Sequence, residues 1–269
     1  MKTYALHTLL LSCSVLFADI SHAEKPVTPC ETLRVTGNPD YPPALWRSKK
    51  DPKKLIGIAV EVLSEALAPE HIEVKSLHVG AWSRSQEQAR SGAIDMLTGA
   101  FITDERQTYM DYVKPPFMEM PSVIWVKQNT AFKFDGWSDL KGKLGVTLIN
   151  NSFGQKFDQF AAEHLEITGV RTAEQVFRLV GLGRMDYGLY ELYQGKAIAQ
   201  VSDAMKGVRH LDPPVSSEGL YYALSKSSVC NTPKLRFYLN RKIAELVEAG
   251  LPTKLEAKYL ELWKQESLK

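Results

Sequence analysis

The sequence has few of the residues from which metal and redox sites are built. Its 269 residues include three cysteines and six histidines, and no two cysteines form a C-x-x-C pair. The histidines beyond residue 23 stand apart, without the spacing of metal ligands: His71, His78, His164 and His210. A G-x-S-x-G elbow, a Walker loop and a dinucleotide fingerprint are also absent. We therefore expect no metal, no cofactor and no zinc- or cofactor-dependent enzyme.

The chain also lacks a strong charge of either sign. It has 33 basic and 31 acidic residues, for a net charge of +2. Removal of residues 1–23 takes away one lysine and one aspartate, so the net charge does not change. A nearly neutral chain has no long-range field to attract nucleic acid or an anionic membrane. We expect neither as a partner.

The sequence has no hydrophobic run long enough to span a membrane, and the run that comes closest lies near the N-terminus. It extends from Leu9 to Phe17, which is too short for a transmembrane helix. A lysine precedes it and small residues follow it, as in a secretory signal peptide. We predict a signal peptide over residues 1–23, and a soluble, exported mature chain that begins near Glu24. Cys13 follows a loosely lipobox-like sequence, so a lipoprotein is the alternative.

Cysteine is scarce but informative. Two cysteines, Cys30 and Cys230, stay in the mature chain, which is bound for an oxidising compartment. We predict a disulfide between them, and two unpaired buried thiols are the alternative. Such a bond would tie the start of the mature chain to a point near its C-terminal helices.

Predicted strands and helices alternate in two blocks, which favours an α/β fold with parallel strands. The C-terminal helices and the predicted disulfide return the chain to the first block. We therefore predict two lobes, lobe 1 over residues 24–126 and 217–269 and lobe 2 over residues 127–216. The chain is expected to cross between them twice, within 122–129 and within 212–224.

Threonines predict where several helices begin. Two of them stand three residues before a glutamine or glutamate, the spacing of a capping box, and a third precedes a proline. These pairs are Thr172 with Gln175, Thr253 with Glu256, and Thr232 with Pro233.

Several residues are suited to binding a small zwitterion, a molecule with one carboxylate and one ammonium group. A buried carboxylate favours a bidentate guanidinium and the free amides of a helix start. An ammonium group favours a carboxylate and an aromatic face. Arg106, within "GAFITDERQTYMDYVKPPF", can supply the first, and Glu191 can supply the second.

The order of several motifs resembles the bacterial extracellular solute-binding proteins of the polar amino-acid type, the periplasmic components of ABC importers. The most specific piece is I-T-x-x-R after a run of small residues, followed by an aromatic and proline segment. Supporting pieces are "GNPDYPP", "GIAVEVL", "SGAIDML", "LKGKLGV" and "GRMDYGLYE". The resemblance covers the whole mature chain. It implies a type II periplasmic binding protein, monomeric, that carries an amino acid or small carboxylate to a membrane permease without catalysis.

The resemblance also implies a ligand-binding site. It places the ligand carboxylate on Arg106, and the ligand ammonium on Glu191. The remaining positions contribute backbone, pocket walls or a polar turn at a helix start: Tyr41, Trp82, Thr98, Gly99, Phe101, Asn151 and Ser152. Thr103 is expected to brace the turn before Arg106.

Four positions depart from the family pattern. Phe101 stands where a small or hydroxyl residue is usual, so we expect a narrower or more aromatic pocket. Glu191 is longer than the usual aspartate, and Ala59 replaces the first aspartate of a helix entry. The "GNPDYPP" turn is one residue short, which displaces its aspartate to Asp40 or replaces it by Pro39.

Two alternatives share the fold. The first is an exported prephenate- or arogenate-type dehydratase, a cyclohexadienyl dehydratase-like enzyme, with Glu191 as general acid in a desolvated cleft. Paired carboxylates for acid–base chemistry are assembled in space, so the sequence alone leaves this possibility open. The second is a binding protein that presents its ligand to a sensor instead of a transporter.

Overall fold

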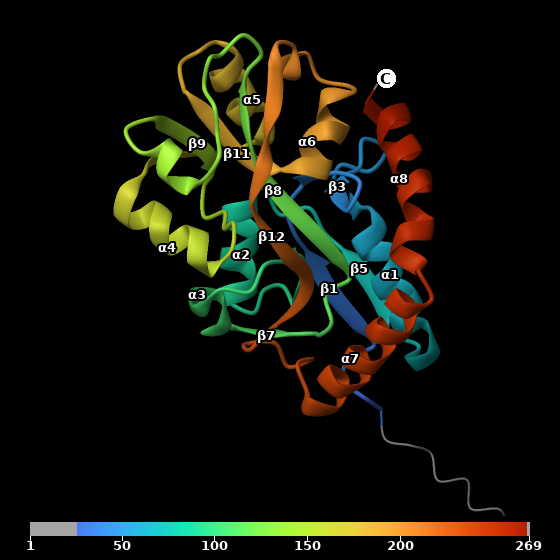
Figure 1. Cartoon of the computed structure of the whole chain (residues 1–269). Helices are drawn as coiled ribbons and strands as arrows, with labels where there is room; N and C mark the ends of the chain where they lie inside the picture. The colour runs from blue at the N-terminus through green and yellow to red at the C-terminus, as the bar shows by residue number, and fades with distance from the viewer. Residues whose placement is uncertain (1–25, 268–269) are drawn as a thin grey trace, which may run out of the picture.

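The computed structural model describes residues 26–267. The predicted signal peptide, residues 1–23, lies outside the described residues. Two groups of elements stand one above the other, joined by two long strands (Figure 1). We call them lobe 1 and lobe 2. Among the described residues, the model has no helix with the length and hydrophobicity to cross a membrane.

Lobe 1 is built on parallel strands in the order β5–β1–β6. Its elements before the crossing are β1 (Thr32–Thr36), β2 (Asp40–Tyr41), β3 (Leu45–Arg47), β4 (Leu55–Ile56), α1 (Ile58–Leu67), η1 (Ala68–Glu70), β5 (Glu73–Ser76), α2 (Trp82–Arg90), β6 (Met96–Ala100), α3 (Asp104–Gln107) and β7 (Met110–Tyr112). Gly57 precedes α1 with a φ of +145°, and a Cβ there would lie 2.3 Å from the carbonyl oxygen of Ala44. Only glycine allows α1 to start so close to the neighbouring backbone.

Lobe 2 repeats the arrangement, with parallel strands in the order β10–β9–β11. Its elements are η2 (Trp137–Leu140), β9 (Leu144–Leu148), α4 (Gln155–His164), β10 (Glu166–Val170), α5 (Ala173–Gly181), β11 (Tyr187–Glu191), α6 (Leu192–Ala199) and η3 (Asp203–Met205). The predicted capping box starts α5, because Thr172 and Gln175 exchange side-chain and backbone hydrogen bonds. The helix then buries Val176, Phe177 and Val180 against the sheet.

Two antiparallel strands belong to both lobes. They are β8 (Met118–Lys127) and β12 (Val208–Ser225), which pair with each other along most of their length. On one side β8 pairs with β11 of lobe 2, and beyond Leu220 β12 pairs with β6 of lobe 1. The chain therefore passes between the lobes twice, on adjacent strands, which is the arrangement of a two-stranded hinge.

The C-terminal helices pack on lobe 1. They are α7 (Pro233–Glu248), whose N-cap is Thr232 as predicted, and α8 (Leu251–Ser267). The prediction that Thr253 caps the last helix is wrong, since α8 already begins at Leu251. From α8, the indole Nε1 of Trp263 donates to the carbonyl oxygen of Ala197 on α6 at 3.0 Å, so this helix also contacts lobe 2.

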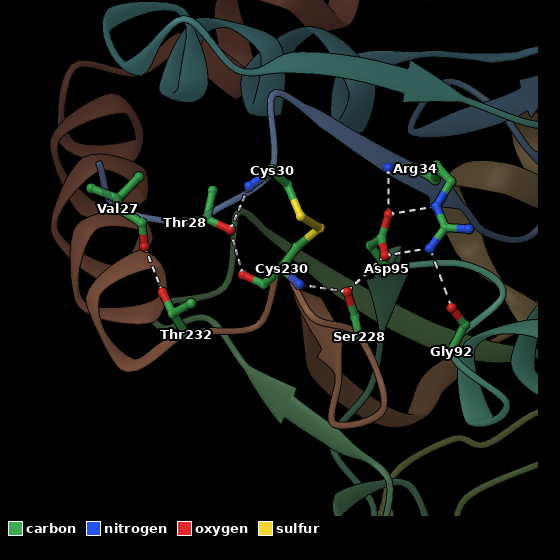
Figure 2. The surroundings of a disulfide bond; sticks show 9 residues. All are labelled: Val27, Thr28, Cys30, Arg34, Gly92, Asp95, Ser228, Cys230 and Thr232. Atoms are coloured by element: carbon green, nitrogen blue, oxygen red, sulfur yellow. Dashed lines mark hydrogen bonds and ion pairs between the residues drawn. A yellow bond between two sulfur atoms is a disulfide. The ribbon is translucent and has the colours of Figure 1, made fainter. Parts of the chain in front are cut away.

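The predicted disulfide between Cys30 and Cys230 is present, and it joins residues 200 positions apart (Figure 2). Hydrogen bonds from two threonines surround it. Thr28 donates to the carbonyl oxygen of Cys230 at 2.9 Å, and Thr232 donates to that of Val27 at 2.5 Å. The bond therefore anchors the N-terminal segment to the start of α7.

Candidate functional site

A small cavity lies where the ends of β6 and β11 face each other across the two lobes, and about 20 Å³ of it is open to the centre of a water-sized sphere. Seven of the nine residues predicted to bind a ligand line it: Tyr41, Trp82, Gly99, Phe101, Arg106, Asn151 and Glu191. Three lining residues were not predicted: Asn38, Ala100 and Leu220. The cavity therefore brings together side chains that are up to about 180 positions apart in the sequence.

The lobe 1 wall is formed by the carboxyl end of β6. Gly99 has a φ of +111°, a conformation that side chains with a Cβ rarely adopt, and it turns the chain toward the cavity. The next residues, Ala100 and Phe101, are buried. The carbonyl oxygen of Phe101 accepts hydrogen bonds from Arg106 Nη1 at 3.1 Å and from the Tyr112 hydroxyl at 2.8 Å. The turn therefore positions both a pocket wall and the arginine.

Arg106 lies on the single-turn helix α3 and is buried. The Thr103 side chain caps this helix by accepting from the Arg106 backbone N–H at 3.1 Å, as predicted. Three of the five guanidinium N–H groups are used, by Gln86 Oε1 at 3.2 Å and by the carbonyl oxygens of Phe101 and Asn150, each at 3.1 Å. The guanidinium carbon lies 5.3 Å from the Trp82 ring centroid. One N–H on each Nη atom is left for another acceptor.

The polar turn after β9 meets Arg106 from lobe 2. Asn150 has a φ of +58°, and its carbonyl oxygen accepts from both Arg106 and Gln86. Asn151 lines the cavity, and its Nδ2 is buried without a hydrogen-bond partner. Ser152 does not line the cavity, since its hydroxyl donates to the Asp158 carboxylate at the start of α4. The turn contributes Asn151, while Ser152 holds the turn to the helix.

Glu191 is the last residue of β11 and is almost fully buried. Burial raises the pKa of its carboxyl from 4.5 to about 7, against the opposing effects of hydrogen bonding and of the Arg106 charge. Its Oε2 atom has no hydrogen-bond partner among residues 26–267. An acceptor atom is costly to bury without a partner, so Oε2 marks a place for a donor.

Tyr41 and Trp82 complete the aromatic walls. Burial, followed by the nearby Glu191 carboxylate, raises the pKa of the Tyr41 hydroxyl well above its usual value. The Tyr41 ring packs edge-on against Tyr190, with ring centroids 6.3 Å apart. The Tyr190 hydroxyl donates to the carbonyl oxygen of Asp40, which fastens lobe 2 to the segment before Tyr41.

Thr98 is placed differently from the prediction. Its buried side chain donates to the carbonyl oxygen of Thr36 at 3.1 Å and does not line the cavity. It therefore ties β6 to β1, behind the wall that Gly99 and Phe101 form. Asn38, which does line the cavity, follows β1 at the same edge of the sheet. Adjacent parallel strands that end at one edge are the signal that could have identified it.

The site holds one cation and one carboxylate among its lining residues, Arg106 and Glu191. The described residues contain no group of three or more side chains that could hold a metal ion. Chemically, the arrangement can pair one negative and one positive group of a small molecule.

Comparison with known proteins identifies relatives of this chain. A probable histidine-binding protein of Campylobacter jejuni is 31% identical over 119 residues, which is 44% of this chain and 44% of that protein. The match thus spans less than half of that relative's length. A Streptococcus pneumoniae amino acid ABC transporter substrate-binding protein, AbpA, bound to L-arginine, superposes with a TM-score of 0.72 at 17% identity, over 89% of this chain and 97% of that one.

Another similar structure is that of an ancestral binding protein. An ancestral amino-acid-binding protein, AncCDT-1, a precursor of cyclohexadienyl dehydratase, superposes with a TM-score of 0.68 at 22% identity, over 86% of this chain and 96% of that one. Together with the two crossings at β8 and β12, these likenesses assign the chain the two-lobed α/β fold of type II periplasmic binding proteins. Residues 33–262 match a single family over most of the chain. The chain therefore belongs to the bacterial extracellular solute-binding proteins, family 3.

Proposed function

We propose that this protein is a periplasmic solute-binding protein that captures an amino acid, or a closely related small carboxylate, between its lobes. The observation that carries the proposal is the cavity itself, where the free N–H groups of Arg106 and the unpartnered Oε2 of Glu191 are buried together. Buried charges are tolerated when they are paired and hydrogen-bonded. An α-amino acid supplies both missing partners, a carboxylate for Arg106 and an ammonium for Glu191.

Ligand binding then favours the closed arrangement of the lobes. Lobe 1 comprises residues 24–126 and 217–269 and lobe 2 comprises residues 127–216, and the lobes move about β8 and β12. Opening must break contacts such as those of Asn150 with Arg106 and Gln86. A ligand that bridges Arg106 and Glu191 adds contacts only in the closed state, so it shifts the population toward that state. We propose that a permease of an ABC importer recognises this closed monomer and accepts the ligand from it.

A thermal-shift screen tests the binding function directly. A ligand that binds only the folded protein raises its melting temperature by mass action. The purified mature chain, freed of bound ligand by unfolding and refolding, is screened against amino acids, polyamines and small carboxylates. We expect a hit that Arg106→Ala abolishes and that Arg178→Ala, an exposed arginine on α5, retains. Equal binding of carboxylate ligands to wild type and Arg106→Ala would contradict the proposed anchor.

One observation favours a second candidate, an exported dehydratase. The pKa of Glu191, raised to about 7, suits a carboxylic acid that donates a proton near neutral pH. The likeness to AncCDT-1, a precursor of cyclohexadienyl dehydratase, points to the same class of reaction. Incubation of the protein with prephenate distinguishes the candidates. Turnover that Glu191→Gln abolishes, with Glu248→Gln on α7 as the exposed control, would replace binding by catalysis as the main function.

A further inference from the structure

We propose that the cavity selects small α-amino acids whose side chains are uncharged and apolar, of the size of alanine to valine. This inference rests on the proposed function and specifies its ligand. It differs from the arginine and histidine named for the relatives. Three properties of the cavity lead to it: the set of unpartnered polar atoms, the volume, and the composition of the remaining wall.

The unpartnered polar atoms match the two charged groups that every α-amino acid shares. The donors include the two free N–H groups of Arg106 and Nε1 of Trp82, on side chains that line the cavity. A carboxylate offers about four lone-pair sites and can accept from all three. The unpartnered acceptor is Oε2 of Glu191, which fits the ammonium group.

No further charge is available for a charged side chain of the ligand. Arg106 and Glu191 are the only ionic side chains among the lining residues described. The nearby carboxylates are engaged elsewhere. Asp40 Oδ2 accepts from the Ala173 backbone N–H at 3.4 Å, and Asp158 accepts from the Ser152 hydroxyl and the Phe153 N–H. An arginine or lysine side chain would lose its hydration without gaining a partner, which is unfavourable.

The volume sets an upper limit on the length of the ligand. About 20 Å³ of the cavity is open to the centre of a water-sized sphere, which is little more than the roughly 10–15 Å³ that a single water molecule needs. Only a ligand with a short side chain can therefore be enclosed without a large displacement of the walls, and the longer side chains of arginine and histidine would hold the lobes apart.

The rest of the cavity wall is mainly apolar and comes mostly from the end of β6 and from β12. Phe101 directly follows β6 and Leu220 lies on β12, and Ala100 and Tyr41 also line the cavity. Phe101 and Leu220 are both nearly fully buried. A short aliphatic side chain gains hydrophobic contacts here, whereas a polar one finds few partners. Phe101 is therefore the residue that limits the pocket.

Isothermal titration calorimetry on the refolded mature chain tests the selectivity. We expect alanine and valine to bind at least about a hundredfold more tightly than arginine, histidine or glutamate. Propionate lacks the ammonium group and alaninamide lacks the carboxylate, and both are expected to bind much more weakly than alanine. If arginine or histidine binds as tightly as valine, the inference is overturned and the proposed function stands. If no amino acid binds, both are overturned.

Enlargement of the pocket tests the role of Phe101. We expect Phe101→Ala to improve the affinity for leucine or methionine relative to valine by about tenfold, because the shortened wall leaves room for the longer side chain. Leu220→Ala is the second variant, in case Phe101→Ala does not fold. The control is Phe237→Ala, since Phe237 is 73% exposed on α7. An unchanged ratio of leucine to valine affinity in a folded pocket variant would contradict the inference.

Discussion

Two buried carboxylates in this protein have opposite surroundings. Asp95, in lobe 1, accepts hydrogen bonds from the Arg34 backbone N–H, from Arg34 Nε and Nη2, and from the Ser228 hydroxyl, at 2.7 to 2.9 Å (Figure 2). Glu191, between the lobes, leaves its Oε2 without a partner among the described residues. Both side chains are about 1% exposed. Burial alone therefore does not distinguish a structural carboxylate from a ligand-binding one, whereas the completeness of its hydrogen bonding does.

The pKa values of the two carboxyl groups move in opposite directions, because only one of them is fully hydrogen-bonded. Burial tends to raise the pKa of both carboxyls. For Asp95, the hydrogen bonds from Arg34 and Ser228 outweigh burial and lower the pKa below 3.8. For Glu191, burial dominates and the pKa rises to about 7. The folded state thus stabilises the charge of Asp95 and destabilises that of Glu191 until a cation is bound.

The largest expected effect comes from the disulfide beside Asp95. Replacement of both Cys30 and Cys230 by alanine opens a loop of 200 residues, which we expect to lower the free energy of unfolding by about 4 kcal/mol. Urea denaturation measures this change. Ligand affinity should change little, because neither cysteine lines the cavity. A variant as stable as the wild type would show that this region holds together without the covalent link.

Substitution of the two carboxylates compares the regions directly. Asp95→Ala removes four hydrogen bonds, three of them from Arg34, and we expect it to cost about 3 kcal/mol of stability. Glu191→Gln removes a charge whose cost of burial outweighs the hydrogen bonds and the Arg106 charge that stabilise it, so we expect no loss of stability but a loss of ligand affinity. Urea denaturation and calorimetry are run on both variants. Equal destabilisation by the two substitutions would contradict the distinction drawn here.

The pH dependence of stability carries the opposite sign at the two sites. Because the pKa of Glu191 is raised in the folded state, folding is favoured while Glu191 is protonated, and this stability is lost as the pH rises from 4.5 toward 7. Because the pKa of Asp95 is lowered, its contribution is present above 3.8 and is lost as the pH falls through its folded pKa. Of these two carboxyl groups, only Glu191 therefore changes the stability of the fold near neutral pH.

We expect the unliganded wild type to lose about 2 kcal/mol relative to Glu191→Gln between about pH 5 and about pH 8. Denaturation curves across this range measure the difference. Other buried carboxyls, such as Asp40 and Asp158, also have raised pKa values, and subtraction of the variant removes their effect. Parallel stability curves for the two proteins would mean that Glu191 does not titrate in this range.

Much of the fold was predictable because it depends on local patterns. The alternation of strands and helices and the capping box at Thr172 and Gln175 depend on residues close together in the sequence. The disulfide was predictable because only two cysteines remain in the mature chain. The prediction at Thr253 is wrong for a local reason as well. The φ of +70° at Gly250 already ends α7, and Pro252 suits the first turn of a helix, so α8 begins three residues earlier than a cap at Thr253 would allow.

The site was predictable only in part, since it depends on where side chains point after the chain turns. Thr98 and Gly99 are neighbours, yet one bonds to β1 behind the cavity and the other lines it. Leu220 reaches the cavity from β12, whose register against β6 shifts by a residue between Tyr221 and Tyr222. A shift of one residue exchanges the two faces of a strand, and no pattern in the sequence indicates it.

The smallest expected effect is also the one that links the Glu191 charge to the ligand. Below a pH of about 7 an increasing share of Glu191 is protonated, and a ligand ammonium must displace that proton before it can pair with the carboxylate. We therefore expect the affinity for the bound amino acid to fall about tenfold between about pH 7.5 and about pH 6, which corresponds to about 1.4 kcal/mol. Calorimetry in buffers of different ionisation enthalpy measures both the affinity and the proton released. Glu191→Gln should bind weakly with no such dependence. An affinity of the wild type that stays constant over this range would mean that the ammonium is held elsewhere, and that the unpartnered oxygen of Glu191 serves another donor.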